Sequence, residues 1–287
     1  MSGNTPRFTI LGAGGFIGAA LADWLDSQGQ AVHAVTRAAL PALLAAHRPA
    51  GHVIDCVGLT GDFRVRPLDT AEAHVGLVAR CLGDLRFESF LLLSSTRVYA
   101  RASTTHEDAA LPTLPADPSD LYNVTKLAGE ALCLADPRPS VRVARLSNVY
   151  GIGMPAETFL GQVLREGQAT ANVTFRQGPA SAKDYVSLTA VVTTLPAIAA
   201  RGTHRVYNIA AGGNTSHAAI AYRLREIAGW RTRFAADAPT VRQPPIDTTR
   251  IDAEFAPASS SLIADLPTML AVAQEPQCSP STKHLAA

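Results

Sequence analysis

The chain has 287 residues and a formal net charge of +1, from 25 lysines and arginines against 24 aspartates and glutamates. The basic residues are scattered and form no basic stripe, so nucleic acid is not an expected partner. The N-terminal residues lack the pattern of a signal peptide, and no apolar run approaches the roughly 18 residues that span a bilayer. We therefore expect a cytoplasmic protein without a membrane partner.

The cysteines give no indication of a metal site. Cys56, Cys81, Cys133 and Cys278 have no metal-ligand spacing, and the first three stand in apolar segments. We expect reduced thiols in the core of the protein.

The first half of the chain alternates strand patterns with helix patterns. Short apolar runs predict buried strands, and apolar residues at helical spacing predict helices. The predicted strands are residues 8–11, 31–36, 52–57, 87–94 and 141–146. The predicted helices are residues 18–28, 38–47, 70–82 and 121–134. This alternation predicts an α/β fold with a doubly wound parallel sheet of the Rossmann type.

The pattern changes after residue 150, which divides the chain into residues 1–150 and a smaller lobe built mainly from residues 151–274. The predicted helices here are residues 158–166, 189–199 and 216–228, and the predicted strands or extended segments are residues 172–176, 183–188 and 206–209. Residues 239–249 read as a proline-rich loop, and residues 275–287 are expected to be a disordered tail.

A glycine-rich turn follows the first predicted strand. Gly12 allows a tight turn, Gly15 lets the backbone approach a pyrophosphate, and Gly18 completes the pattern. Phe16 and Ile17 lead into the helix predicted at residues 18–28 and are predicted cofactor residues, because the amino end of this helix offers free amides and a positive dipole end to the pyrophosphate. The pattern predicts a dinucleotide site, with a plain turn as the alternative.

The end of the second predicted strand indicates which dinucleotide is bound. The carboxylate that usually binds the ribose there is missing, and Thr36 and Arg37 take its place. A guanidinium suits a 2′-phosphate, so the sequence predicts NADP, with NAD as the alternative. The other interpretation is that Arg37 lies over the adenine.

A phenol and an ammonium stand four residues apart in the helix predicted at residues 121–134. Tyr122 and Lys126 share one helical face, and an ammonium beside a phenol stabilises the phenolate. Tyr122 could then pass a proton to or from an alcohol at neutral pH. Upstream, the strand predicted at residues 87–94 runs into the hydroxyl residues Ser95 and Thr96.

The glycine turn, the strand with hydroxyls and the Tyr-Lys helix, in this order, resemble the extended short-chain dehydrogenase/reductase superfamily, in particular its NAD(P)-dependent nucleotide-sugar epimerases and dehydratases. The resemblance implies that Ser95, Tyr122 and Lys126 are catalytic. Ser95 and Tyr122 would hydrogen-bond the substrate oxygen, with Tyr122 as general acid and base, and Lys126 would hold the nicotinamide ribose. It also implies a dinucleotide-binding domain in residues 1–150 and a mainly substrate-binding lobe in residues 151–274.

Two departures from the family pattern carry information. Only a short helix separates the strand ending at Thr36 from the strand starting at His52, so one edge strand of the family sheet is expected to be deleted and the cofactor site to be more open. Thr96 and Arg97 occupy the places of the Asp-Glu pair that removes water in sugar 4,6-dehydratases. The resemblance therefore favours hydride transfer without elimination.

Further residues receive roles by the resemblance. The segment from Val57 to Thr60 is similar to one in UDP-galactose 4-epimerases, so Val57 and Gly58 would line the cofactor, and Thr60 would contact substrate or be a loop residue. Leu146 precedes an Asn-Val-Tyr-Gly motif and would line the nicotinamide. In that motif Asn148 would bind the sugar or the diphosphate, or would be a turn residue.

Lys183 takes the place of a phosphate-binding arginine in the family pattern, or has no role. With Thr96, it completes the predicted substrate contacts. The family commonly dimerises through helices that correspond to residues 70–82 and 121–134, so a homodimer is implied.

The leading hypothesis is an NAD(P)-dependent enzyme that moves a hydride at C4 of a nucleotide-linked hexose, as a 4-epimerase or a 4-ketoreductase. Two alternatives stay open: a reductase of a non-sugar ketone or aldehyde, and a regulator that binds NADP without turnover. The nucleotide, the sugar and the stereochemistry are not specified by the sequence.

Overall fold

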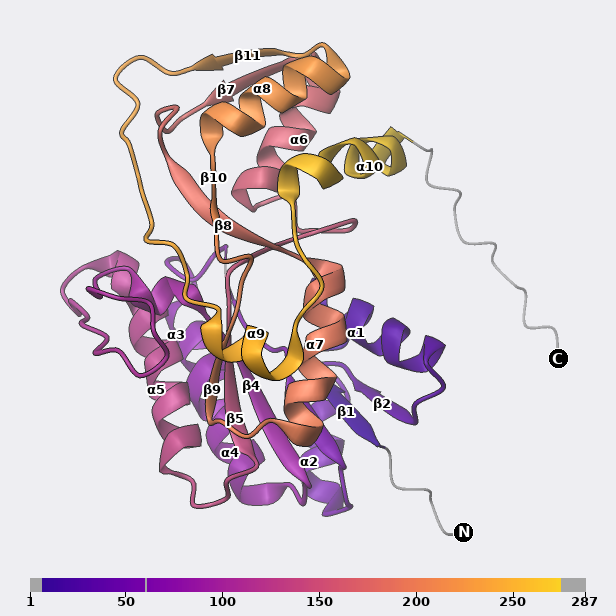
Figure 1. The fold of residues 1–287 in the computed structure, drawn as a ribbon. Helices are drawn as coiled ribbons and strands as arrows, with labels where there is room; N and C mark the ends of the chain where they lie inside the picture. The colour runs from indigo at the N-terminus through magenta and orange to yellow at the C-terminus, as the bar shows by residue number, and fades with distance from the viewer. Residues whose placement is uncertain (1–6, 60, 275–287) are drawn as a thin grey trace, which may run out of the picture.

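The computed structural model describes residues 7–59 and 61–274. The strands of its central sheet are β1 (Phe8–Leu11), β2 (Val32–Val35), β3 (His52–Asp55), β4 (Ser89–Ser95), β5 (Val141–Leu146) and β9 (Val206–Ile209). They form one six-stranded parallel sheet in the order β2-β1-β3-β4-β5-β9 (Figure 1). The chain reverses direction across the sheet between β1 and β3, and the carboxyl ends of strands at such a point form a ligand crevice. The predicted Rossmann-type sheet is confirmed.

The central sheet is buried on both faces. The helices that cover it are α1 (Phe16–Ser27), α2 (Leu40–Ala46), α4 (Leu77–Asp84), α5 (Leu121–Ala135) and α7 (Leu188–Arg201). Leu91 and Leu93 of β4 pack in the core shared with α1 and α7, whereas Phe90 and Leu92 pack in the core shared with α2, α4 and α5. Alternate side chains enter opposite cores, which explains the continuous apolar run in this strand.

β2 is an edge strand of the sheet, because β1 lies between β2 and β3. In the part of the chain that the structure describes, no further strand pairs with β2. The helix α2 alone links β2 to β3. The predicted deletion of one edge strand is therefore confirmed.

A smaller lobe stands above the carboxyl ends of the sheet in Figure 1. Its strands are β6 (Asn148–Tyr150), β7 (Asn172–Phe175), β8 (Ala182–Ser187), β10 (Asn214–Ser216) and β11 (Arg231–Phe234). Its helices are α6 (Phe159–Thr170), α8 (His217–Ala228) and α10 (Leu262–Gln274). A separate core that includes Leu160, Val173, Leu224 and Leu266 holds the lobe together.

The division of the chain near residue 150 needs a qualification. α7 packs on the central sheet, β9 completes that sheet, and α9 (Thr249–Phe255) packs beside β9. The chain thus enters the smaller lobe three times, at β6, β10 and α10, and returns to the central sheet after the first two. The expected tail at residues 275–287 lies outside the described residues, as does Cys278. Cys56, Cys81 and Cys133 are free thiols.

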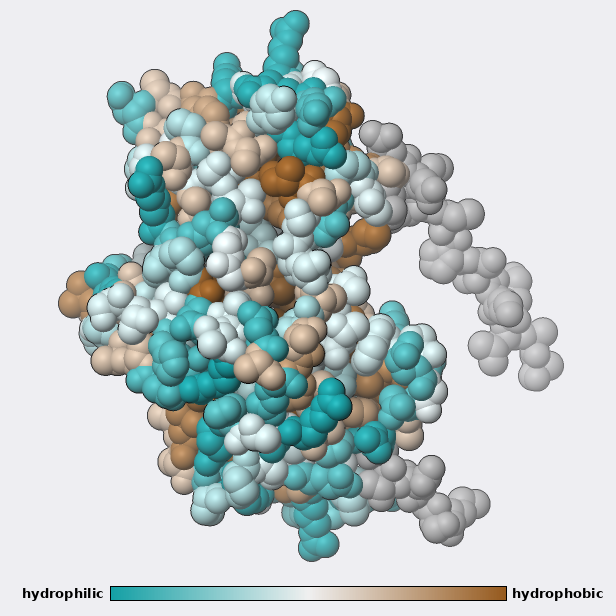
Figure 2. Space-filling view, in the orientation of Figure 1, coloured by the Kyte–Doolittle hydropathy of each residue, from teal (hydrophilic) through white to brown (hydrophobic). Residues whose placement is uncertain are grey.

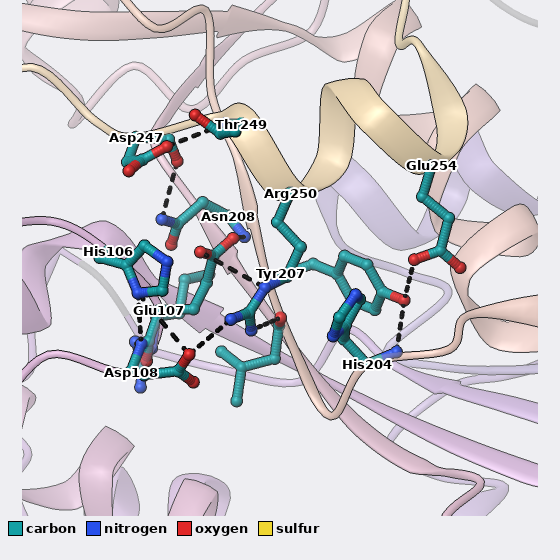
Figure 3. A network of polar contacts seen from close by, with 12 residues as sticks. His106, Glu107, Asp108, His204, Tyr207, Asn208, Asp247, Thr249, Arg250 and Glu254 are labelled. Atoms are coloured by element: carbon teal, nitrogen blue, oxygen red, sulfur yellow. Dashed lines mark hydrogen bonds and ion pairs between the residues drawn. The ribbon is translucent and has the colours of Figure 1, made fainter.

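A polar network holds the segment before α5 against β9 and α9 (Figure 3). Arg250 of α9 lies 3.7 Å from the buried carboxylate of Glu107 and 2.7 Å from the exposed carboxylate of Asp108. Glu107 also accepts a hydrogen bond from the backbone N–H of Asn208 at 3.1 Å, and Arg250 donates to the carbonyl of Val206 at 2.9 Å. Three segments far apart in sequence are joined through these contacts.

Hydrophilic residues cover most of the face shown in Figure 2, and hydrophobic residues form small separate patches there. None of the helices in residues 7–59 and 61–274 is long and apolar enough to cross a membrane.

Candidate active site

The glycine turn between β1 and α1 has the geometry that the sequence predicts. Gly12 has φ +76°, and a Cβ atom there would lie 3.1 Å from the backbone of Cys56 and Val57. A Cβ atom at Gly18 would lie 2.3 Å from the carbonyl oxygen of Gly12. Gly12 is required for its left-handed conformation, and Gly18 is required because the helix approaches the turn closely there.

The amino end of α1 is open to a ligand. Gly15 is the N-cap residue and no side chain caps the helix, so the amides of Phe16 and Ile17 open its first turn. A Cβ atom at Gly14 would meet nothing within 4 Å. An uncapped helix end beside an uncrowded backbone fits a pyrophosphate, and these residues would hold that part of a dinucleotide.

Thr36 and Arg37 lie next to this turn. They directly follow Val35, whose carbonyl accepts hydrogen bonds from the backbone N–H groups of Gly12 at 3.0 Å and Ala13 at 3.1 Å. Both residues are exposed. The guanidinium is therefore carried at the strand end where a dinucleotide fold binds the adenosine ribose.

The segment that follows β3 lies between the glycine turn and α5. Val57 lies against Gly12, and a Cβ atom at Gly58 would lie 3.4 Å from both the Nζ atom of Lys126 and the Nε2 atom of His74. Val57 and Gly58 thus lie between the glycine turn and α5, and their contact with a cofactor stays a prediction. Thr60 lies outside the described residues.

Lys126 and Asp55 are both buried, and each affects the pKa of the other. The ammonium of Lys126 donates to the carbonyl of Leu93 at 2.9 Å. Burial lowers the pKa of Lys126 to about 8, against the opposing effect of Asp55. Burial likewise raises the pKa of Asp55 to about 6, although the backbone N–H of Val57 donates to its Oδ1 atom at 3.0 Å. Burial thus favours the neutral form of each.

Tyr122 stands at the start of α5 and is 6% exposed. Burial raises the pKa of Tyr122 above its ordinary value, and the Ser95 hydroxyl and the Arg97 guanidinium oppose this effect. The ammonium of Lys126 is directed at the carbonyl of Leu93. Ser95 ends β4, and its Oγ atom accepts a hydrogen bond from the Arg97 N–H at 3.2 Å.

His74 is a member of the site that the sequence did not single out. Its Nδ1 atom lies 2.9 Å from the Thr125 hydroxyl, and its Nε2 atom accepts from the backbone N–H of Leu59 at 3.3 Å. Burial and the charge of Lys126 lower the pKa of His74 to about 3, so the ring is neutral. The ring packs edge-on to that of Tyr122, with centroids 5.3 Å apart. His74 therefore positions both the segment after β3 and the ring of Tyr122.

Helical spacing could not have identified His74. It lies in η1 (Glu72–Gly76), a π-helical turn between α3 (Pro67–Ala71) and α4. Such a turn rotates the following residues relative to an ideal α-helix, and these turns are frequent at functional sites. The predicted helix over residues 70–82 is present, but the turn within it was not expected.

Leu146, the predicted nicotinamide residue, and Thr96, a predicted substrate residue, lie at the carboxyl ends of central strands, whereas the predicted substrate residues Asn148 and Lys183 lie in strands of the smaller lobe. Leu146 is buried and pairs in register with Ser95. Thr96 is buried at the start of η2 (Thr96–Tyr99). Asn148 donates from its amide to the carbonyl of Asp184 in β8 at 2.8 Å, so one of its N–H groups is already used by the fold. Lys183 lies in β8, with its ammonium 5.4 Å from the ring centroid of Phe159.

A cavity of about 630 Å³ lies elsewhere on the molecule. Its lining contains none of Ser95, Tyr122 and Lys126 and includes Leu127, Leu134 and Arg250. This cavity is therefore separate from the predicted catalytic residues.

The sheet, the glycine turn and the Ser-Tyr-Lys cluster define a nucleotide-dependent enzyme of the short-chain dehydrogenase/reductase type. The model of the NAD dependent epimerase/dehydratase family matches residues 8–210. The chain belongs to that family. No curated protein matches the chain.

Solved structures share the fold at low sequence identity. An NAD-dependent NDP-hexosamine 5,6-dehydratase, TunA, involved in tunicamycin biosynthesis, is 21% identical with a TM-score of 0.77, over 93% of this chain and 96% of that chain. MoeE5 in complex with UDP-glucose and NAD is 24% identical with a TM-score of 0.76, over 92% and 97%. RMD from Pseudomonas aeruginosa complexed with NADPH is 21% identical with a TM-score of 0.75, over 93% and 98%. These similarities establish the fold.

Proposed function

We propose that this protein moves a hydride at C4 of a nucleotide-linked hexose, as a 4-epimerase or a 4-ketoreductase. The observation that carries the proposal is the convergence of Ser95, Tyr122 and Lys126 at the strand ends beside the open glycine turn. The family membership and the UDP-glucose bound by the structural neighbour MoeE5 support it.

The roles follow from position and protonation. A bound nicotinamide dinucleotide supplies the hydride chemistry. Tyr122, whose raised pKa keeps the phenol protonated at neutral pH, donates a proton to a C4 carbonyl oxygen or, in the reverse direction, receives it from the alcohol. Ser95 hydrogen-bonds the same oxygen, and Lys126 supplies a cation and donors for the nicotinamide ribose.

The residues after Ser95 argue against elimination of water. Thr96 and Arg97 have no carboxylate, and removal of a proton from carbon with loss of hydroxide needs a base and an acid at those places. Hydride transfer without dehydration is the function that this set of side chains supports best.

Replacement of Tyr122 by Phe tests the function. We expect turnover of the 4-keto or 4-hydroxy nucleotide sugar to fall about 10²- to 10⁴-fold, with dinucleotide affinity unchanged, because the phenol serves proton transfer. Tyr222→Phe is the matched control, since Tyr222 is 62% exposed in α8 and should leave turnover unchanged. Activity retained in Tyr122→Phe would refute the catalytic role. Net consumption of NADPH separates a reductase from an epimerase.

We further propose NADP as the preferred cofactor, because Arg37 stands beside the glycine turn and residues 28–53 contain no carboxylate. Titration of the purified protein should show NADP binding at least about tenfold more tightly than NAD, and Arg37→Gln should remove most of that preference. Arg48→Gln, an exposed arginine beyond α2, serves as the control. Equal or tighter binding of NAD by the unaltered protein would contradict this preference.

The homodimer that the family suggests remains a proposal. α5 presents Leu132 and Leu134 at 36% and 41% exposure, so this helix has apolar side chains free for a partner. Light scattering of the purified protein measures the mass directly.

A further inference from the structure

Cationic side chains gather next to the catalytic phenol. The guanidinium of Arg97 lies 5.4 Å from the ring centroid of Tyr122 and 5.2 Å from that of Phe63. The guanidinium of Arg64 lies 4.4 Å from the same Phe63 ring. Lys183 enters from β8, and its pKa is lowered first by burial and then by the charge of Arg97. Three positive charges from separate segments therefore act on one another at this place.

These charges have no counter-ion among the residues that the structure describes. In residues 7–59 and 61–274, none of Arg64, Arg97 and Lys183 takes part in an ion pair. The carboxylates that face Arg97 are Asp117 and Asp120. Arg101 already bonds both, at 2.8 Å and 2.9 Å.

The guanidinium of Arg97 is held in place but retains unused donors. Its Nη2 atom donates to the carbonyl of Ser119 at 3.0 Å, and its plane has aromatic rings of Tyr122 and Phe63 as neighbours. Arginine carries five N–H donors in a fixed fork that matches a carboxylate. A half-buried cation without an ionic partner is costly, and an anionic ligand would offset that cost.

We propose that Arg97 binds a carboxylate on the sugar itself, so that the substrate is a nucleotide-linked hexuronate. This inference rests on the proposed function. When the C4 oxygen is hydrogen-bonded by Tyr122 and Ser95, the exocyclic C6 is attached to C5, the ring neighbour of C4. A cation beside the Tyr122 ring is therefore within reach of a C6 carboxylate.

The diphosphate of the substrate is the competing anion. It is attached at C1, across the pyranose ring from C4, and so lies away from Tyr122 when C4 is placed for reaction. We assign Lys183 of β8 to the diphosphate, because it takes the place of the phosphate-binding arginine in the family pattern. Arg97 is thus assigned to the C6 carboxylate and Lys183 to the diphosphate. Binding of substrates with and without the carboxylate tells the two roles apart.

Calorimetric binding to the full chain, with NADP or NAD present, tests the inference. UDP, dTDP and GDP are compared first, and the tightest is then compared with its hexose and its hexuronate conjugates. We expect the hexuronate to bind more tightly than the hexose. Arg97→Gln should weaken the hexuronate about 10- to 100-fold, the loss expected for a charge-assisted pair, and leave the diphosphate and the hexose conjugate within about threefold. Lys183→Gln should weaken all three.

The outcomes separate the inference from the function on which it rests. Failure of every nucleoside diphosphate to bind overturns the proposed function itself. Equal binding of hexose and hexuronate by the unaltered protein, or loss of diphosphate affinity in Arg97→Gln, overturns the hexuronate inference alone. Arg97→Lys keeps the charge and should recover part of the hexuronate affinity, and melting temperatures confirm that the variants are folded.

Discussion

Asp55 and Lys126 are buried side chains of opposite charge whose pKa values, about 6 and about 8, lie on either side of neutral pH. The Oδ2 atom of Asp55 has no hydrogen-bond partner among the described residues. The pair therefore carries a desolvation cost, which the protein bears next to the residues that we propose as catalytic.

The cost at Asp55 appears in the pH dependence of stability. The folded-state pKa of Asp55, about 6, lies above the ordinary 3.8. Protonated Asp55 therefore contributes fully to the free energy of unfolding below pH 3.8, and this contribution is lost as pH rises through about 6. Asp55→Asn cannot titrate and should flatten this fall, by up to about 3 kcal/mol. Urea unfolding from pH 4 to 7 measures it. Asp26→Asn, at an exposed position in α1, should keep the pH dependence, and an unchanged slope in Asp55→Asn would contradict the burial argument.

At the scale of residues, spacing predicted the pairing of Tyr122 with Lys126 on one helix but not the direction of the ammonium. Four residues along a helix set a shared face. Where the ammonium points depends on Asp55 and on the carbonyl of Leu93, which come from other strands. His74 was missed for the same reason, because its partners Leu59 and Thr125 are 15 and 51 residues away.

The helical segments η1 and α5 approach each other closely at Gly129. A Cβ atom at Gly129 of α5 would lie 2.3 Å from the carbonyl oxygen of His74. A backbone carbonyl cannot move aside as the end of a flexible side chain can, so the position of α5 that meets η1 must be a glycine. This contact fixes the distance between the His74 ring and Tyr122.

Gly129→Ala should destabilise the protein by about 1 to 3 kcal/mol, because the added methyl forces η1 and α5 apart. Chemical denaturation measures the loss, and turnover should fall with it, since His74 and Tyr122 move relative to each other. Gly83→Ala in α4 is the matched control: nothing lies within 4 Å of a Cβ atom there, and the change should gain up to about 1 kcal/mol. If the two variants were equally stable, the packing argument would be wrong.

At the scale of elements, the strands of the large sheet were predictable and those of the smaller lobe only partly. β5 and β9 have the predicted bounds, because buried parallel strands are apolar throughout. β6, β10 and β11 have three or four residues each and were not expected. Their pairing partners are distant in sequence, so too little local pattern exists to predict them. The helices α9 and α10 were also missed.

At the scale of the whole molecule, Arg250 joins α9 to the segment before α5 and to β9. Its removal would leave the carboxylate of Glu107, whose side chain is fully buried, without an ionic partner. Arg250→Ala should therefore destabilise the protein by about 3 kcal/mol, measured as a fall in the free energy of unfolding. Asp108 is the other ionic partner of Arg250, and its side chain is 70% exposed. Asp108→Ala should therefore lower the free energy of unfolding by at most about 1 kcal/mol. Similar losses in both variants would show that the burial of Glu107 is unimportant.

The edge position of β2 affects how long a dinucleotide stays bound as well as how tightly it binds. Beyond β2 the described residues provide no strand, so an adenosine bound beside Thr36 and Arg37 has protein on fewer sides. Such a dinucleotide is bound at its pyrophosphate and ribose, but its adenine is poorly enclosed. We expect it to dissociate quickly, because most differences in affinity are expressed in the dissociation rate. A short residence time suits an enzyme that releases its dinucleotide after each turnover. An epimerase on this scaffold would have to regenerate the dinucleotide within a single, brief encounter.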